Sequence, residues 1–228
     1  EKINFEKIYN DLSSESRLYS AYEDNNFYLK DENKKYKMGY INTEKLLKND
    51  EVLKLINHDY IIEVLSNYFG VEFIFDNIWS WWSFKHDDKP LGPQNFHRDY
   101  NSLNFLKLFI YLTEVDDDSG PHVFIKKSHK KDVFNKIARY NDREIEEKFK
   151  KEEILKIKGN KYKIFLANTF CLHKGIPPIK NDRLLLCVLY SVKPSRACPK
   201  LPIFDASTSK VSNTLYKNKS LNKMYFKY

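Results

Sequence analysis

The sequence predicts a mainly β protein, an antiparallel barrel or jelly roll that carries a helical cap. Three observations lead to this fold class. Segments rich in β-branched and aromatic residues recur after residue 70, separated by turns and long inserts. Helices and strands do not alternate as they would in a parallel α/β sheet. Apolar residues in the first 70 positions recur at a helical period instead, so we expect helices there that cover one sheet.

The length of 228 residues fits one domain, 1–228, with 42% hydrophobic and 15% aromatic residues to build its core. We divide it into a helical cap (1–70), a jelly-roll core (71–198) and a basic tail (199–228). A charged insertion at 129–156 interrupts the core and has a helical period. The tail is weakly patterned and is expected either to wrap the body or to be partly disordered.

The cap begins with apolar residues spaced for one helical face, namely Ile3, Phe5, Ile8, Tyr9 and Leu12. Thr43 is placed as the N-cap of a later helix, and Gly70 is placed to end the last one. Residues 23–40 have no clear period and are predicted as a loop with a short hairpin.

The strongest predicted strand lies within residues 103–115, and its residues divide by parity between two faces. One face is uniformly apolar and suits packing, with Leu106, Leu108, Ile110 and Leu112. The other combines polar tips with aromatic bodies, with Lys107, Phe109, Tyr111 and Thr113. The second face suits the wall of an interior that holds a ligand.

The net charge is +8 and the isoelectric point is near 9.1, a balance compatible with an anionic small molecule, nucleic acid or a membrane surface. The lysines are spread along the whole chain, which favours a solubilising surface. No RNA-binding signature, zinc-finger spacing or apolar run of about 18 residues is present. We therefore predict that the partner is a small molecule, which includes anionic substrates. We predict no binding to nucleic acid or to a membrane. The oligomeric state stays open.

Cys171, Cys187 and Cys198 are odd in number and none has C-x-x-C spacing, which argues for a reducing compartment. No signal peptide is visible. The predicted location is the cytoplasm.

The triplet His97-Arg98-Asp99 is the first part of a candidate metal site. About one H-x-[DE] triplet is expected by chance in such a chain, and a second one, His86 to Asp88, runs into an exposed turn. The His97 triplet instead lies just before the strongest strand, where a rigid element can hold ligands in place. In extended backbone His97 and Asp99 share one face.

A third ligand must come from a remote segment. His58 lies at a helix junction, His122 follows a turn and His129 lies in a loop or lid. His173 is better placed, because it ends an apolar strand and precedes Gly175. Two imidazoles and one carboxylate can bind one face of an octahedral Fe(II) and leave three positions for a chelating cosubstrate and O₂. The alternative is two hydrogen-bonded sheet histidines and a turn aspartate.

Arg183 opens the apolar run Leu184 to Leu186, where an unpaired guanidinium is costly to bury. A bound dicarboxylate would supply a bidentate partner through its far carboxylate. The alternative partner is the neighbouring Asp182.

Several blocks of the sequence resemble the phytanoyl-CoA dioxygenase-like branch of the Fe(II)/2-oxoglutarate oxygenases. They are F-H-R-D-Y-N, L-K-L-F-I-Y-L-T-E-V-D, S-G-P-H-V-F-I-K-K-S-H-K, L-H-K-G-I-P-P and D-R-L-L-L, in this order between about residues 94 and 191. The resemblance implies a double-stranded β-helix, a cupin-like jelly roll.

The resemblance also implies a cofactor and its ligands. It implies that His97, Asp99 and His173 are the catalytic metal ligands of Fe(II), with 2-oxoglutarate and O₂ as cosubstrates. It implies that Arg183 pairs with the C5 carboxylate of 2-oxoglutarate. Further candidate contacts to the cosubstrate or substrate are Gln94, Lys107 and Tyr111. Cys171 is interpreted as a residue of the core and not as a ligand.

Two comparisons with the family pattern matter. The loop that usually ends in P-G-S-H-K here reads K-K-S-H-K, from Lys126 to Lys130, which alters that turn and adds charge near the lid. Asp99 is intact, whereas family halogenases lack this carboxylate, so halogenation is disfavoured.

The resemblance implies an oxidoreductase, a dioxygenase that hydroxylates a small or carrier- or sugar-linked metabolite and releases succinate and CO₂. Desaturation, ring formation and epimerisation at the same iron centre stay open. So do a binding module without turnover and a metal-dependent isomerase or hydrolase that ignores 2-oxoglutarate. Trp79, Trp81 and Trp82 are predicted to pack in the core in preference to walling a pocket.

Overall fold

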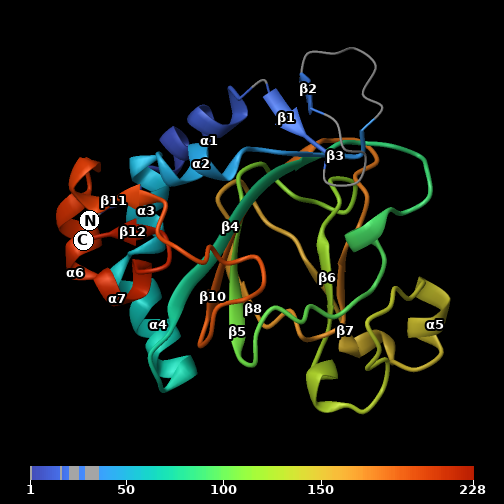
Figure 1. Cartoon of the computed structure of the whole chain (residues 1–228). Helices are drawn as coiled ribbons and strands as arrows, with labels where there is room; N and C mark the ends of the chain where they lie inside the picture. The colour runs from blue at the N-terminus through green and yellow to red at the C-terminus, as the bar shows by residue number, and fades with distance from the viewer. Residues whose placement is uncertain (1, 16, 21–25, 29–35) are drawn as a thin grey trace.

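The structure is a computed structural model that describes residues 2–15, 17–20, 26–28 and 36–228. It is mostly sheet with several helices, as the sequence predicted. A large antiparallel sheet lies in the middle, helices from both ends of the chain cover one of its faces, and a smaller sheet lies on the other side (Figure 1).

The large sheet has seven strands in the order β2-β1-β3-β4-β10-β5-β8. In that order the strands span Asn26–Tyr28, Arg17–Tyr19, Met38–Tyr40, Ile74–Ser83, Arg183–Ser191, Phe105–Tyr111 and Ile164–Ala167. Every pair in this sheet is antiparallel. β10 is buried along its whole length, since it lies between β4 and β5 with both faces covered.

The smaller sheet has three antiparallel strands in the order β7-β6-β9. They span Ile154–Ile157, His122–Ile125 and His173–Gly175. A separate parallel pair joins β11 and β12, Phe204–Asp205 and Phe226–Lys227.

The helices of the cap are α1 to α4, at Phe5–Ser13, Thr43–Leu47, Asp50–Ile56 and Asp59–Phe69. Gly70 ends α4 in the left-handed conformation (φ 66°), as predicted. The prediction of Thr43 as an N-cap is wrong by one residue. Asn42 is the N-cap of α2, because its side-chain oxygen accepts the backbone N–H of Glu44 at 2.8 Å.

Two hydrophobic clusters lie on opposite faces of the large sheet, and β5 contributes to both. Leu106, Leu108 and Ile110 pack against the helices, whereas Phe109 and Tyr111 lie in the cluster between the two sheets. The parity predicted for this strand is therefore confirmed. The face with polar tips is the one turned toward the smaller sheet.

The helical prediction for 129–156 is wrong over most of that segment. It contains one α-helix, α5 (Asp142–Glu146), flanked by irregular backbone and by the single turns η2 (Ser128–Lys130) and η3 (Lys151–Glu153). Its few apolar residues, Ile145 and Phe149 among them, bury into a small cluster with Phe96, and they are too sparse to hold a longer helix.

The tail 199–228 wraps the body, which was one of its two predicted states. It forms η4 (Ala206–Thr208), α6 (Ser212–Lys217) and α7 (Lys219–Asn222) besides β11 and β12. Leu215, Leu221, Tyr225 and other apolar side chains of the tail pack with the cap helices in the main core.

The predicted loop and hairpin at 23–40 lie largely outside the described residues. Within the described part, β2 pairs with β1, and β3 joins β1 to β4. Among the described residues, no helix has the length and apolar character needed to cross a membrane.

Candidate active site

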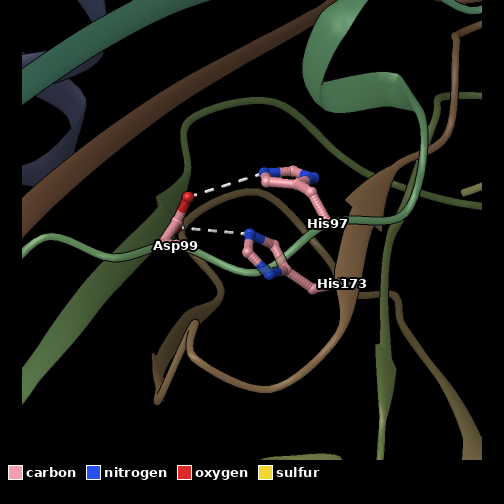
Figure 2. Close-up of side chains that lie close together, drawn as sticks. All are labelled: His97, Asp99 and His173. Atoms are coloured by element: carbon pink, nitrogen blue, oxygen red, sulfur yellow. Dashed lines mark ion pairs between the residues drawn. The ribbon is translucent and has the colours of Figure 1, made fainter. Parts of the chain in front are cut away.

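His97 and His173 face each other from two segments that are distant in sequence. They form an antiparallel bridge in which each backbone N–H donates to the other residue's carbonyl oxygen at 2.9 Å. Their ring centroids are 4.3 Å apart. Figure 2 shows both imidazoles turned toward Asp99. The structure thus brings together the three residues that the sequence singled out.

Each imidazole is held by a backbone carbonyl two residues earlier in the chain. His97 Nδ1 lies 2.9 Å from the carbonyl oxygen of Asn95, and His173 Nδ1 lies 3.0 Å from that of Cys171. Because a carbonyl only accepts, we assign the proton to Nδ1 in both rings. The Nε2 lone pairs then point to Asp99, which is the second-sphere arrangement typical of metal-binding histidines.

The Asp99 carboxylate completes the group. Its Oδ1 lies 3.6 Å from His97 Nε2, and its Oδ2 lies 3.4 Å from His173 Nε2. One donor atom from each residue lies within 4.8 Å of the other two, so a single ion can reach all three. Lys107 Nζ donates to Asp99 Oδ2 at 2.7 Å.

Burial and charge set the protonation of this group. Burial alone would raise the pKa of Asp99, but the positive charge of Lys107 lowers it below its ordinary value, and the electrostatic interaction with the two imidazoles acts in the same direction. Burial lowers the pKa of His97 to about 3, and the neighbouring His173 contributes in the same direction. Burial also lowers the pKa of His173. The site therefore offers two neutral imidazoles and one ionised carboxylate at neutral pH.

Arg98 anchors the segment between His97 and Asp99, a role that the sequence reasoning missed. Its side chain points away from the metal-ligand side and donates to four backbone carbonyls. These are Ser128 (2.8 Å), Val133 (3.0 Å), Phe134 (3.1 Å) and Phe170 (2.7 Å). The guanidinium therefore ties the His97 segment both to the insertion and to the turn between β8 and β9 that leads to His173.

Arg183 begins β10 and is 3% exposed. Its Nη2 donates to Ser83 Oγ at 3.1 Å, whereas Nε and Nη1 are buried without a partner in the described part of the chain. The alternative pairing with Asp182 does not account for these atoms, and that carboxylate accepts from the backbone N–H of Lys85. Burial lowers the pKa of Arg183, and Tyr111 acts in the opposite direction.

Gly175 connects Arg183 to the His173 strand. A β-carbon built on Gly175 would lie 3.3 Å from Arg183 Nη2. The guanidinium therefore lies against β9 only two residues beyond His173. Two unpartnered guanidinium nitrogens of a buried cation in this place are complementary to an anion.

The other predicted contacts have different surroundings. Lys107 lines the cavity at the site and pairs with Asp99. Gln94 is buried in a turn, where Oε1 accepts from Leu91 N–H at 2.7 Å and Nε2 lies 3.1 Å from His86 Nε2. These contacts occupy both ends of the Gln94 amide. Tyr111 is buried between the sheets, with its hydroxyl bonded to the smaller sheet.

A cavity of about 240 Å³ opens at the three candidate ligands. Lys107, Phe109, His122 and Gly175 line it inside, and Arg139 of the insertion contributes from an exposed position. Trp79 and Trp81 also line it while packing on the inter-sheet cluster, whereas Trp82 packs on the main core. The core-packing prediction therefore describes Trp82 fully and the other two only in part.

Cys171 and His129 lie outside the group of three. His129 Nδ1 is 2.9 Å from Cys171 Sγ, and Cys171 is half-buried rather than part of the core. His122 was interpreted from its turn-proximal position alone. The sequence does place His122 and Phe124 on one face of the predicted strand, because they are two residues apart, but it does not show that this strand pairs with the His173 strand.

Comparisons with known proteins give the fold. No family model and no curated protein matches the chain. HygX from Streptomyces hygroscopicus, with nickel and 2-oxoglutarate bound, matches with a TM-score of 0.56 and 11% identity over 84% of this chain and 78% of that one. HygX with nickel, 2-oxoglutarate and hygromycin B bound matches with a TM-score of 0.50 and 12% identity, over 70% of this chain and 71% of that one.

The non-heme alpha ketoglutarate dependent carbocyclase SnoK from nogalamycin biosynthesis matches with a TM-score of 0.50 and 14% identity, over 70% of this chain and 68% of that one. The chain shares the fold of these proteins. The phytanoyl-CoA dioxygenase-like branch itself is not matched by a family model.

Proposed function

We propose that this protein is an Fe(II)- and 2-oxoglutarate-dependent dioxygenase that hydroxylates a small metabolite and releases succinate and CO₂. One observation carries the proposal. Two neutral imidazoles and an ionised carboxylate converge at a cavity, and a buried arginine with unpartnered N–H groups lies against Gly175 of the same cavity wall.

The donor set fits Fe(II). His97, Asp99 and His173 supply the two-histidine, one-carboxylate set that non-heme iron oxygenases use, with positions left for other ligands. Iron, when bound, supplies the redox chemistry that couples decarboxylation of 2-oxoglutarate to oxidation of the substrate by O₂. The Asn95 and Cys171 carbonyls hold the imidazole tautomers that this binding requires.

Arg183 fits the second carboxylate of 2-oxoglutarate. A 2-oxo dicarboxylic acid has a chelating end for the metal and an anionic end for a buried cation. Without such an anion, Nε and Nη1 of Arg183 stay desolvated and unsatisfied, which is costly. HygX and SnoK support the proposal, since HygX has been solved with nickel and 2-oxoglutarate bound and SnoK is an alpha ketoglutarate dependent enzyme.

The cavity wall supports a substrate with a ring. Tyr40 and Trp81 stand with ring centroids 5.7 Å apart, and Trp79 lies under the Lys107 ammonium at 5.3 Å. Flat aromatic walls suit sugar or aromatic rings. The exposed Arg139 suits an acidic group on the substrate. We therefore propose a small or carrier- or sugar-linked substrate, anionic in character, with the insertion as its cover.

The experiment that tests this function measures succinate formed from 2-oxoglutarate under air by the Fe(II)-loaded protein. Asp99→Ala and His173→Ala should lower the rate at least 100-fold, and Arg183→Met should raise the concentration of 2-oxoglutarate that is required by about 100-fold. His58→Ala is the matched control, because this histidine lies at the start of α4, away from the candidate site.

The outcomes separate the alternatives. Metal binding without succinate formation would indicate a binding module. A metal-dependent reaction that Arg183→Met leaves unchanged would indicate an isomerase or hydrolase. Metabolite screening for substrate-dependent succinate release then identifies the substrate. The mass of its product distinguishes hydroxylation (one added oxygen atom) from desaturation, ring closure or epimerisation.

A further inference from the structure

His122 is a buried imidazole that none of the roles above uses. It begins β6, is 5% exposed and lines the cavity at the candidate metal site. Aromatic rings surround it, with the Phe109 centroid at 5.0 Å and the Phe165 centroid at 6.0 Å. Burial and the nearby charge of Arg183 lower the pKa of His122 well below its ordinary value, so the ring is neutral. A neutral imidazole has one donor and one acceptor nitrogen.

Tyr111 holds one of the two nitrogens. The Tyr111 hydroxyl lies 3.1 Å from His122 Nδ1, accepts the backbone N–H of His122 at 3.1 Å and lies 3.0 Å from the carbonyl oxygen of Ile157. The hydroxyl hydrogen thus has two acceptors within reach, Nδ1 and the carbonyl. When it points to Nδ1, the imidazole proton must lie on Nε2.

The other nitrogen is directed to Gly175 and the Arg183 guanidinium. A β-carbon built on Gly175 would lie 3.9 Å from His122 Nε2 and 3.3 Å from Arg183 Nη2. Both polar ends therefore border the space over this glycine. The structure gives Nε2 no hydrogen-bond partner among the described residues, although the side chain is more than nine-tenths buried.

His122 is not a fourth metal donor. The group of donor atoms that can reach one ion contains His97, Asp99 and His173 and does not include His122. Its free nitrogen is next to a cation that itself has unpartnered N–H groups. Two such donors beside one another are complementary to the two oxygens of a carboxylate.

We propose that His122 Nε2–H is a second hydrogen-bond donor, beside Arg183, to the far carboxylate of 2-oxoglutarate, and that the Tyr111 hydroxyl then turns its hydrogen from the Ile157 carbonyl to Nδ1. This inference rests on the proposed function, because it assigns a further residue to the cosubstrate of that reaction. It explains why a histidine lies among the aromatic rings at this end of the cavity.

The test measures 2-oxo acid binding to the Zn(II)-loaded protein by calorimetry, without turnover. His122→Phe keeps a flat ring and removes both nitrogens. It should weaken 2-oxoglutarate binding on the order of tenfold or more, the size expected for a hydrogen bond to a charged group. The matched ligand is 2-oxopentanoate, which has the same chain length and a methyl group in place of the far carboxylate. Its affinity should change less than twofold.

Equal weakening for both acids, or no weakening for either, overturns the assignment of His122. If the unsubstituted protein binds zinc but not 2-oxoglutarate, the proposed function fails as well. Tight binding that His122→Phe leaves unchanged contradicts this inference alone.

A second measurement needs no His122 substitution. In ¹⁵N spectra of the zinc- and 2-oxoglutarate-loaded protein, His122 should carry its proton on Nε2, with Nδ1 bare. Tyr111→Phe should weaken 2-oxoglutarate binding by a smaller factor, about threefold, because the ring is then free to adopt either tautomer. A His122 ring with its proton on Nδ1 in the complex overturns the proposal.

Discussion

His97 and His173 are each other's backbone hydrogen-bond partners, with both N–H to carbonyl distances at 2.9 Å. Two candidate metal ligands that are 76 positions apart in the sequence are therefore held together by backbone hydrogen bonds, independently of any bound metal. Each imidazole is held by a further contact, because its Nδ1 also bonds a carbonyl two residues earlier. A binding group preorganised in this way pays little conformational entropy when the metal binds.

Loss of the Arg98 side chain should destabilise the protein, because this side chain anchors the segment that carries His97 and Asp99. Arg98→Met leaves four backbone carbonyls without their donor, and we expect the free energy of unfolding to fall by roughly 3 kcal/mol. Urea unfolding monitored by fluorescence measures this change. Arg143→Met on the same insertion is the control, since Arg143 forms an exposed pair with Glu147 and should cost less than about 0.5 kcal/mol. Equal losses in the two variants would refute the anchoring role.

Lys107 should oppose divalent metal binding while stabilising the metal-free protein. Its ammonium pairs with Asp99 and carries a positive charge beside the candidate site. Lys107→Met should destabilise the metal-free protein by about 1 to 3 kcal/mol and bind Mn(II) more tightly than the unsubstituted protein. Unfolding curves with and without Mn(II) give both values, because bound metal adds stability in proportion to its affinity. A smaller stabilisation by Mn(II) in the variant would contradict this prediction.

Gly175→Ala should separate cosubstrate binding from metal binding. The added β-carbon would lie 3.3 Å from Arg183 Nη2, so the guanidinium must shift by a few tenths of an ångström. We expect about tenfold weaker 2-oxoglutarate binding, because the bidentate geometry is lost, and an unchanged Mn(II) affinity. Calorimetric titration of each ligand checks both. The prediction fails if the Mn(II) affinity falls along with that for 2-oxoglutarate.

Lowering the pH should destabilise the metal-free protein already in the range where Asp99 is still ionised. Burial lowers the pKa of His97 to about 3, whereas an unfolded histidine takes up its proton near pH 6.5. Between these values the unfolded state binds more protons, so the free energy of unfolding falls as pH falls, by about 1.4 kcal/mol per pH unit for one proton. Asp99, whose pKa is lowered, adds a further loss only below its ordinary unfolded value.

Denaturant titrations from pH 7 to pH 4 measure this slope. His97→Gln removes one of the buried imidazoles and should give a shallower slope than the unsubstituted protein. A free energy of unfolding that stays level over this range would contradict the burial of neutral histidines.

The sequence was sufficient for the residues whose positions follow from local rules. His97 and Asp99 share a face because they are two residues apart in extended backbone, and the parity of β5 was readable for the same reason. Arg183 was identifiable because a cation at the start of an apolar strand needs an anion. These inferences needed no knowledge of which strands are neighbours.

The remaining features depend on contacts between segments that are distant in sequence. His122 and Gly175 meet because β6 and β9 are paired, and a turn-proximal histidine gives no sign of that pairing. Arg98 was overlooked because its four acceptors are backbone atoms, which any sequence provides. Gln94 bonds within its own turn and to His86, and neither contact is readable from its position before the triplet.

The most direct measurement counts metal ions bound per chain. Free Mn(II) is followed by electron paramagnetic resonance during titration of the metal-free protein, with Fe(II) under anaerobic conditions as a second ion. We expect one tight site per chain, at least 100-fold weaker binding in each of His97→Ala, Asp99→Ala and His173→Ala, and unchanged binding in His58→Ala. Absence of a tight site in the unsubstituted protein, or a site that survives all three substitutions, would contradict the account.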